Sequence, residues 1–214
     1  MAGPGVLPEE AHERRKYFKL YGKLILLQAP ALAWSLLLAL RFAPGGLGAA
    51  AATRLAAMRP HGLWCAYAAW YVVYLTRTYA SISANGARAP AKVPRPDQHA
   101  YVVADGAAAG ATVAMASEGA AGRFNRAQRA AFNQDESAAV FATGLLLVGV
   151  AFSPLALAVS AVWAWGRVQF CDTYTRDLGL RGTAMKVSIA TEHVSAACVG
   201  AALVELLAGP VLFA

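Results

Sequence analysis

Charged residues are scarce in this chain. Only 14% of its 214 residues are charged, whereas 58% are hydrophobic, and the mean hydropathy is +0.44. A soluble domain carries about 25% charged residues, so the composition excludes an ordinary soluble protein. We therefore expect an integral membrane protein.

Other absences narrow the class further. The alternation of apolar and polar residues that membrane-spanning strands need does not recur, so we expect all-α membrane segments. The odd cysteine count gives no disulfide framework, and no Cys/His spacing indicates a metal site. No RNA- or DNA-binding motif accompanies the net charge of +7. We assign that charge to membrane orientation and to contact with the lipid bilayer rather than to nucleic acid.

The chain contains several long apolar stretches. A span needs about 20 apolar residues. Five candidates follow one another: 20–42, 61–84, 126–152, 155–175 and 186–208. An amphipathic segment beginning at Pro8 precedes the first, with acidic residues in its first turn. Residues 85–125 form a long connection, and we expect its opening prolines, in GARAPAKVPRPD, to end the preceding helix. The Ser153-Pro154 pair is expected to turn the chain between the third and fourth spans.

The positive residues favour this five-span topology. One side holds the N-terminus, the 85–125 connection and the 172–186 loop. It would carry Arg14, Arg15, Lys16, Lys19, Arg88, Lys92, Arg95, Arg123, Arg176, Arg181 and Lys186. The opposite side would carry only Arg41, Arg54 and Arg59, and the positive-inside tendency predicts such an asymmetry. Arg77 lies inside the second span, where we favour an ion pair with a neighbouring helix over catalysis.

A polar stripe begins the third span. In FNRAQRAAFNQDE, Arg129, Asn133 and Glu136 fall on one face of a helix. Such groups are costly in a membrane and usually face a protein interior or a polar cavity. The alternative is a helix start whose charges lie among lipid headgroups.

A second stripe ends the fourth span. Arg167, Tyr174 and Arg181 recur at seven-residue intervals, which places them on one helical face. Because the third and fourth spans form an antiparallel hairpin, we expect Arg129 and Tyr174 at the same membrane depth. Two converging stripes of this kind suit a small zwitterionic or anionic ligand.

These segments resemble the MAPEG family, the membrane-associated proteins of eicosanoid and glutathione metabolism. GARAPAKVPRPD is similar to the family's basic, proline-containing segment, and FNRAQRAAFNQDE to its signature F-x-R-x-x-R-A-x-x-N-x-x-E. WGRVQFCDTYTRDLGLR is similar to the end of its third helix. The resemblance is closest to the branch of microsomal glutathione transferase 3 and leukotriene C synthase.

The resemblance implies a fold and a function. Residues 61–214 would form a four-helix membrane domain, and residues 1–60 would add an amphipathic segment, an extra transmembrane helix and a linker. The family assembles as a homotrimer that binds glutathione, which implies a glutathione transferase or peroxidase acting on lipophilic compounds in the endoplasmic reticulum. Arg181 would stabilise the glutathione thiolate. The remaining ligands would be Arg129, Asn133, Glu136, Tyr174, Arg88 and Arg167.

Several residues depart from the family pattern. Ala131, Phe132, Ser137 and Phe170 stand where members often have polar or tyrosine side chains. The extra span and the long Ala/Gly-rich insertion are also outside the pattern. The alternative hypothesis is therefore a non-catalytic accessory subunit, with unlike membrane subunits as neighbours, in a bioenergetic or photosynthetic complex of a mitochondrial or plastid membrane.

Overall fold

The computed structural model describes residues 7–42, 53–54, 56–57, 60, 62–104, 112–177 and 182–208. Most of the linker predicted before residue 60 therefore lies outside the described residues. The chain is largely helical, with one small sheet. Its elements are α1 (Pro8–Phe42), α3 (Trp64–Ala91), β1 (Tyr101–Ala104), β2 (Thr112–Met115), α4 (Gly119–Ala151), α5 (Ser153–Arg176) and α6 (Gly182–Ala208).

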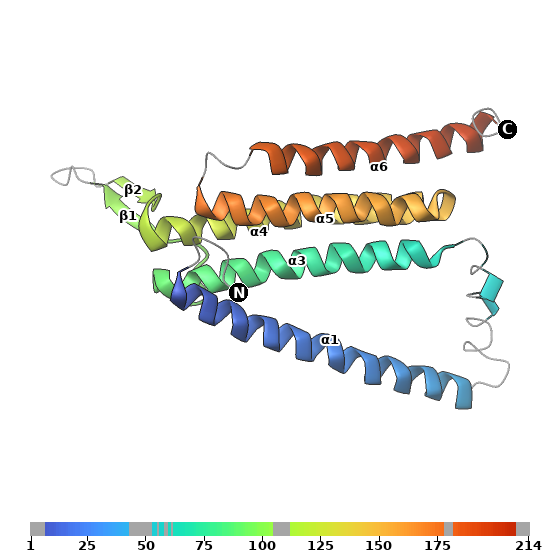
Figure 1. Cartoon of the computed structure of the whole chain (residues 1–214), viewed down its shortest axis with the longest axis horizontal. Coiled ribbons are helices and arrows are strands. Elements are labelled where there is room, and N and C mark those ends of the chain that lie inside the picture. Colours follow the sequence, from blue (N-terminus) through green and yellow to red (C-terminus); the bar gives the residue numbers. More distant parts are fainter. Residues whose placement is uncertain are drawn as a thin grey trace.

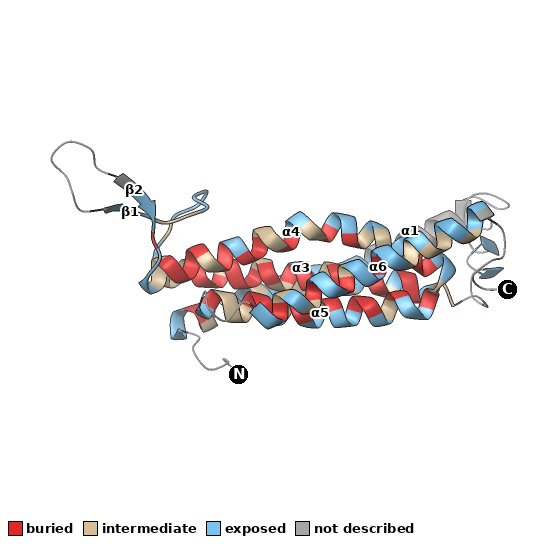
Figure 2. Ribbon diagram, turned by 90° about the horizontal axis from the view of Figure 1, so that it is seen from above, coloured by how far each residue is buried: buried red, intermediate tan, exposed pale blue. Residues whose placement is uncertain are grey.

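Four helices form an elongated bundle, and α1 lies along one side of it (Figure 1). α3, α4 and α5 pack against one another, α6 packs on α4 and α5, and α1 packs on α3. α1 meets α3 near the N-terminus and diverges from it toward the other end. Figure 2 shows most of the buried residues on α3, α4 and α5, whereas α1 and α6 are largely exposed.

Two apolar clusters fill the bundle. One is built mainly of alanines around Phe124 and Phe170, near the end that holds the hairpin. The other surrounds Trp163, whose ring stacks on Phe141 with a centroid distance of 4.4 Å. The small side chains of the first cluster allow helices to approach closely, as is common in membrane bundles.

The sequence predicted helices only, and the structure adds one small sheet outside the predicted spans. β1 and β2 pair as an antiparallel hairpin, with Tyr101 opposite Met115 and Ala104 opposite Thr112. Valine, threonine and tyrosine favour extended backbone, and the two short runs that contain them form the strands. The hairpin stands out from one end of the bundle (Figure 1).

The connection between α3 and α4 is shorter than predicted. α3 continues through Pro90 to Ala91, and α4 begins at Gly119 rather than near residue 126. Pro90 lies in the last turn, where it removes one backbone hydrogen bond without breaking the helix earlier. Lys92 then leaves the helix with a φ of 54°, and its N–H bonds to the carbonyl of Ala89.

The predicted Ser153-Pro154 turn is also wrong in detail. Phe152 alone separates α4 from α5, and both predicted turn residues belong to the first turn of α5. Proline fits there because the first amide groups of a helix have no partner within it.

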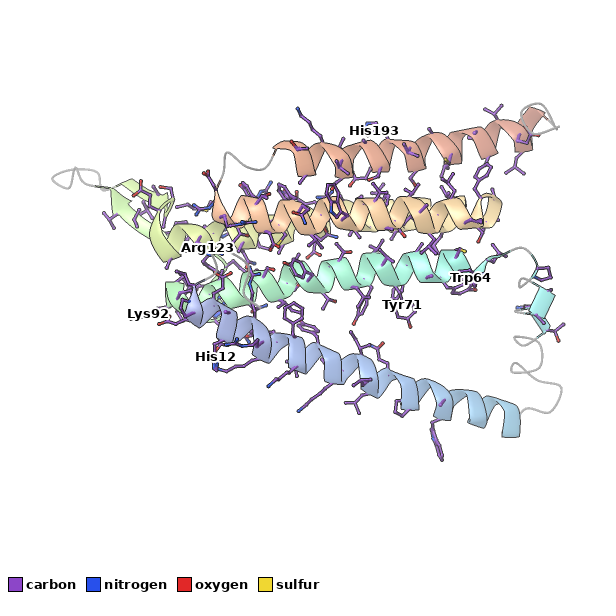
Figure 3. All side chains as sticks on the ribbon, in the orientation of Figure 1. His12, Trp64, Tyr71, Lys92, Arg123 and His193 are labelled. Atoms are coloured by element: carbon purple, nitrogen blue, oxygen red, sulfur yellow. The ribbon has the colours of Figure 1, made fainter. Side chains whose placement is uncertain are left out.

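A buried carboxylate joins α1 to the bundle. The side chain of Glu10 is fully buried. Its Oε2 accepts from Nε of Arg123 at 2.6 Å, and its Oε1 lies 2.7 Å from Nη2 of Arg14. Arg14 also lies 3.7 Å from Asp172, which accepts a hydrogen bond from the Tyr79 hydroxyl at 2.7 Å. This Glu10 network, comprising Glu10, Arg14, Arg123, Asp172 and Tyr79, connects four helices where their ends meet, around Arg123 in Figure 3.

One stretch among the described residues, Gly182–Leu207 in α6, is long and apolar enough to cross a membrane by length and composition alone. Five spans remain a prediction.

The ion pair expected for Arg77 is present: its Nε lies 2.6 Å from Oδ1 of Asp135 on α4.

Candidate functional site

Arg129, Asn133 and Glu136 lie on α4, as the spacing predicts. Nη1 of Arg129 donates to Oε1 of Glu136 across 3.2 Å, so the two ends of the stripe are joined. Both side chains are about half exposed, at 51% and 58%. Each therefore has polar atoms available to a ligand.

Tyr174 faces this stripe from α5. Its ring stacks on Phe170 with centroids 5.2 Å apart and planes 11° from parallel, which fixes its orientation. A cavity of about 330 Å³ lies between these helices and the start of α6. Its lining residues are Arg129, Asn133, Phe170, Tyr174, Gly182, Met185 and Lys186. Arg129 and Asn133 of the first stripe thus meet Tyr174 of the second at one cavity, whereas Glu136 reaches it only through its bond to Arg129.

Arg167 does not line this cavity. Its side chain is only 3% exposed, and Nη2 lies 2.6 Å from Oε1 of Glu192 on α6. The same nitrogen donates to the Ser137 hydroxyl at 2.5 Å, and Nη1 donates to the Asn133 carbonyl at 3.4 Å. Arg167 therefore joins α4, α5 and α6, and the Ser137 hydroxyl accepts one of its hydrogen bonds.

Arg88 also lies away from the cavity. Its Nη1 donates to the carbonyls of Pro94 and Asp97, at 3.0 and 2.6 Å, and its guanidinium lies 4.8 Å from the ring centre of Phe124. Burial, followed by the charge of Arg95, lowers the pKa of Arg88. Within one chain, Arg88 orders the connection that follows α3.

Arg181 lies outside the described residues. α5 ends at Arg176, where Asp177 takes an extended backbone, so the expectation of one continuous helical face from Arg167 to Arg181 is wrong. The residue that follows Arg181, Gly182, lines the cavity.

Two of the residues that depart from the family pattern pack against other side chains. Ala131 is buried in the alanine-rich cluster. The ring of Phe132 lies against His99, with centroids 5.8 Å apart. Neither residue lines the cavity.

Sequence reasoning missed two parts of this region. Lys186 brings a second cation to the cavity, whereas its place in the sequence indicated only a role in membrane topology. The Glu10 network was missed as well. Its local signal is the i, i+4 spacing of Glu10 and Arg14, which places an acid and a base on one helical face.

Comparison with models of known protein families gives a match. A sequence model of the MAPEG family matches residues 62–201, which is well over half of the chain. No curated protein matches the chain. The matched region begins just before α3 and includes every candidate residue discussed above.

Proposed function

Because the chain belongs to the MAPEG family of helical membrane proteins that use glutathione, we propose that it is a membrane-bound, glutathione-dependent transferase or peroxidase. Its substrates are lipophilic electrophiles or lipid hydroperoxides. The observation that carries the proposal is the single cavity shared by Arg129, Asn133 and Tyr174. Five spans, with the extra helix α1 outside residues 61–214, complete the proposed architecture.

The charges at the cavity suit glutathione. This tripeptide has two carboxylates and one ammonium group at neutral pH. Arg129 and Lys186 offer cations for the carboxylates, and Glu136, bonded to Arg129, offers a carboxylate for the ammonium group. Asn133 and Tyr174 add uncharged hydrogen-bonding groups.

Arg181 is the proposed catalytic residue. A free thiol has a pKa of about 8.5, and a nearby guanidinium favours the nucleophilic thiolate. Arginine suits this role because it keeps its charge in an apolar setting. In the transferase reaction, the sulfur bonds to an electrophilic carbon and the displaced or ring-opened group takes a proton. In the peroxidase reaction, two glutathione molecules reduce the hydroperoxide to an alcohol and water and become glutathione disulfide.

The test uses the full chain in detergent. Titration calorimetry is expected to show glutathione binding, and ultraviolet difference absorbance is expected to show bound thiolate at neutral pH. Arg181→Ala should return the thiol pKa to about 8.5 and remove the thiolate signal, while glutathione still binds. Arg15→Ala, at an exposed position on α1, is the matched control and should change neither signal. Absence of binding to the unaltered protein would reject the proposal.

A second function is favoured by α1. This helix is fixed to the bundle through the buried Glu10, and its Leu26, Leu27 and Trp34 remain exposed. Such a face would also suit an accessory subunit among unlike membrane subunits. Isolation as an active homotrimer would exclude that role.

A further inference from the structure

The first half of α1 has an inner face that is fixed to the bundle. Glu10 and Arg14 lie on this face and belong to the Glu10 network. One turn further on, the hydroxyl of Tyr17 accepts a hydrogen bond from Nη2 of Arg95, in the connection that follows α3. These contacts fix the rotation of α1 about its own axis. The opposite side of the helix therefore faces away from the bundle.

This outer face carries a basic stripe. Its members are all exposed, and they lie three, four, seven and eleven residues after the first, within about 100° of the helix circumference. They are His12, Arg15, Lys16, Lys19 and Lys23. Figure 3 shows His12 on the side of α1 that faces away from α3. Lys16 pairs with Glu13 at 2.5 Å, and the sequence has no acidic residue from 17 to 42. The stripe therefore becomes purely cationic toward the middle of α1.

The same face of α1 is apolar beyond the stripe. Leu26, Leu27 and Trp34 continue it, and their exposed fractions in the single chain are 72%, 65% and 65%. In the proposed five-span arrangement α1 crosses the bilayer, so these side chains face lipid tails. Lys23 precedes Leu26 by three residues, or about 4.5 Å along the axis. Cations and apolar side chains thus follow each other on one face as the headgroup and tails of a phospholipid do.

The direction of the lysine side chains favours contact with headgroups. Side chains on a helix lean toward its N-terminus, which in the five-span arrangement lies outside the hydrocarbon core. A lysine can lay its apolar stem along a lipid-facing surface while its ammonium group stays in the polar layer. Lys19 and Lys23 are therefore placed to carry their charges outward, toward the phosphate groups of the adjacent leaflet.

We propose that the basic stripe of α1 binds anionic phospholipids, with the headgroups on the cations and the acyl chains along Leu26, Leu27 and Trp34. An acidic soluble protein would match the cations but not the apolar continuation of the face. A zwitterionic headgroup brings its own cation, which the stripe repels. α1 lies before the residues that match the family model, so the surface belongs to the part of the chain outside that match. The assignment rests on the proposed five spans and is independent of glutathione chemistry.

Photolabelling from within the bilayer tests this assignment. The full chain is placed in phosphatidylcholine nanodiscs with a trace of phosphatidylglycerol or phosphatidylcholine that carries the same diazirine-bearing acyl chain. Adducts are mapped by mass spectrometry after chymotryptic digestion. We expect the phosphatidylglycerol probe to label residues 24–34 at least about fivefold more, the factor that one cation near an anionic lipid contributes. Raising the salt concentration from about 0.05 M to about 0.5 M should reduce this ratio, because salt screens the charges.

Matched variants separate the stripe from the general charge of the protein. Lys19→Gln/Lys23→Gln removes the two cations nearest the apolar side chains and should lower the ratio several-fold, whereas Lys19→Arg/Lys23→Arg keeps both charges and should preserve it. Arg54→Gln/Lys92→Gln also removes two exposed cations, both outside α1, and should leave the ratio unchanged. An unchanged ratio in Lys19→Gln/Lys23→Gln, or an equal loss in Arg54→Gln/Lys92→Gln, would overturn the assignment.

The two probes also separate the stripe from the arrangement on which it rests. Leu206 and Leu207 of α6 are 83% and 79% exposed, and their labelling by both probes shows that each probe reaches the chain. Equal labelling of residues 24–34 by the two probes would keep α1 in the bilayer and reject the anionic headgroup. No labelling of residues 24–34 by either probe would reject both the stripe assignment and the crossing of α1. Neither result depends on whether the chain binds glutathione.

Discussion

At the scale of single residues, Arg167 shows how one buried cation can hold three helices together. It contacts Glu192 on α6 and Ser137 on α4, and its guanidinium lies 5.3 Å from the ring centre of Trp163. Burying an ion is costly, and hydrogen bonds and a close partner offset the cost. Arg129 differs because its partner Glu136 and its own side chain are about half exposed. The two arginines therefore contribute to stability by very different amounts.

The Arg167–Glu192 pair predicts a large and coupled effect on stability. Arg167→Met should lower the free energy of unfolding by about 3–5 kcal/mol, because Glu192 would remain without its cation. The double variant Arg167→Met/Glu192→Met should recover most of that loss, since no unpaired charge remains. Unfolding in mixed micelles, followed by circular dichroism during titration with SDS, measures all variants.

Arg129→Met is the control for this cycle. An exposed pair contributes about 0–1 kcal/mol, so this variant should unfold nearly as the unaltered chain does. Additive losses in the double variant would mean that Arg167 and Glu192 are not coupled.

The positions of the candidate residues could be predicted where they depend on helix periodicity, but not where they depend on which side chain of a neighbouring helix is the partner. Arg129, Asn133 and Tyr174 meet at one cavity, as spacing and the hairpin predicted. Arg167 shares the periodicity of Tyr174, but periodicity does not show which groups a neighbouring helix brings. Arg167 forms an ion pair with Glu192, which lies 25 residues further along the chain. Only the packing of α6 on α5 reveals that contact.

At the scale of elements, α1 is attached by polar contacts at one end. Arg14 reaches Glu10 past Gly86 of α3, where a Cβ would lie 2.4 Å from Cγ of Arg14. The absence of a side chain at Gly86 thus makes room for the arginine. Farther along, α1 diverges from α3 (Figure 1). The Glu10 network, together with the contacts of Tyr17 with Arg95 and of Phe18 with Tyr79, therefore docks this end of α1.

Gly86→Ala should release the docked end of α1. The added methyl group forces Arg14 out of its position and so breaks its contact with Glu10. Trypsin cleavage at Lys16 and Lys19, both exposed on α1, should become several times faster, because cleavage requires local opening of the helix.

Gly22→Ala is the matched control on α1 itself. Nothing lies within 4 Å of a Cβ at this position. Alanine should stabilise the helix by about 0.5–1 kcal/mol, so tryptic cleavage should be unchanged or slower. Equal cleavage rates for the Gly86 and Gly22 variants would show that the Glu10 network does not hold α1.

The order of the helices could be predicted from apolar length, but their ends could not. All five predicted spans lie largely within the observed helices. Pro90 is tolerated in the last turn of α3, and Pro154 begins α5 instead of turning the chain. Proline marks a helix boundary without showing on which side of it the helix lies. The β1–β2 hairpin was not predicted, because its two short strands lie in an alanine-rich segment.

At the scale of the whole molecule, cations gather at one end of the bundle. The start of α1, the end of α3 and the start of α4 meet there, beside the end of α5 (Figure 1). Arg14, Arg88 and Arg123 belong to this end, as do the hydrogen bonds of the Glu10 network. Positive residues near span ends favour the cytoplasmic side. The cavity lined by Arg129 and Lys186 lies toward the same end, which is consistent with the proposed water-soluble ligand, glutathione.

This arrangement makes a topology prediction. In a variant without native cysteines, single cysteines at His12 and Asp97 should react with a membrane-impermeant maleimide from the same side of sealed vesicles. A cysteine at Ala57, in the segment between α1 and α3, should react only from the opposite side, because both helices cross the membrane in the five-span arrangement. Labelling of all three from one side would mean that α1 and α3 do not cross. Labelling of His12 and Asp97 from opposite sides would mean that one of the predicted spans does not cross. That result would contradict this fold, because the bond between Glu10 and Arg123 holds the start of α1 beside the start of α4.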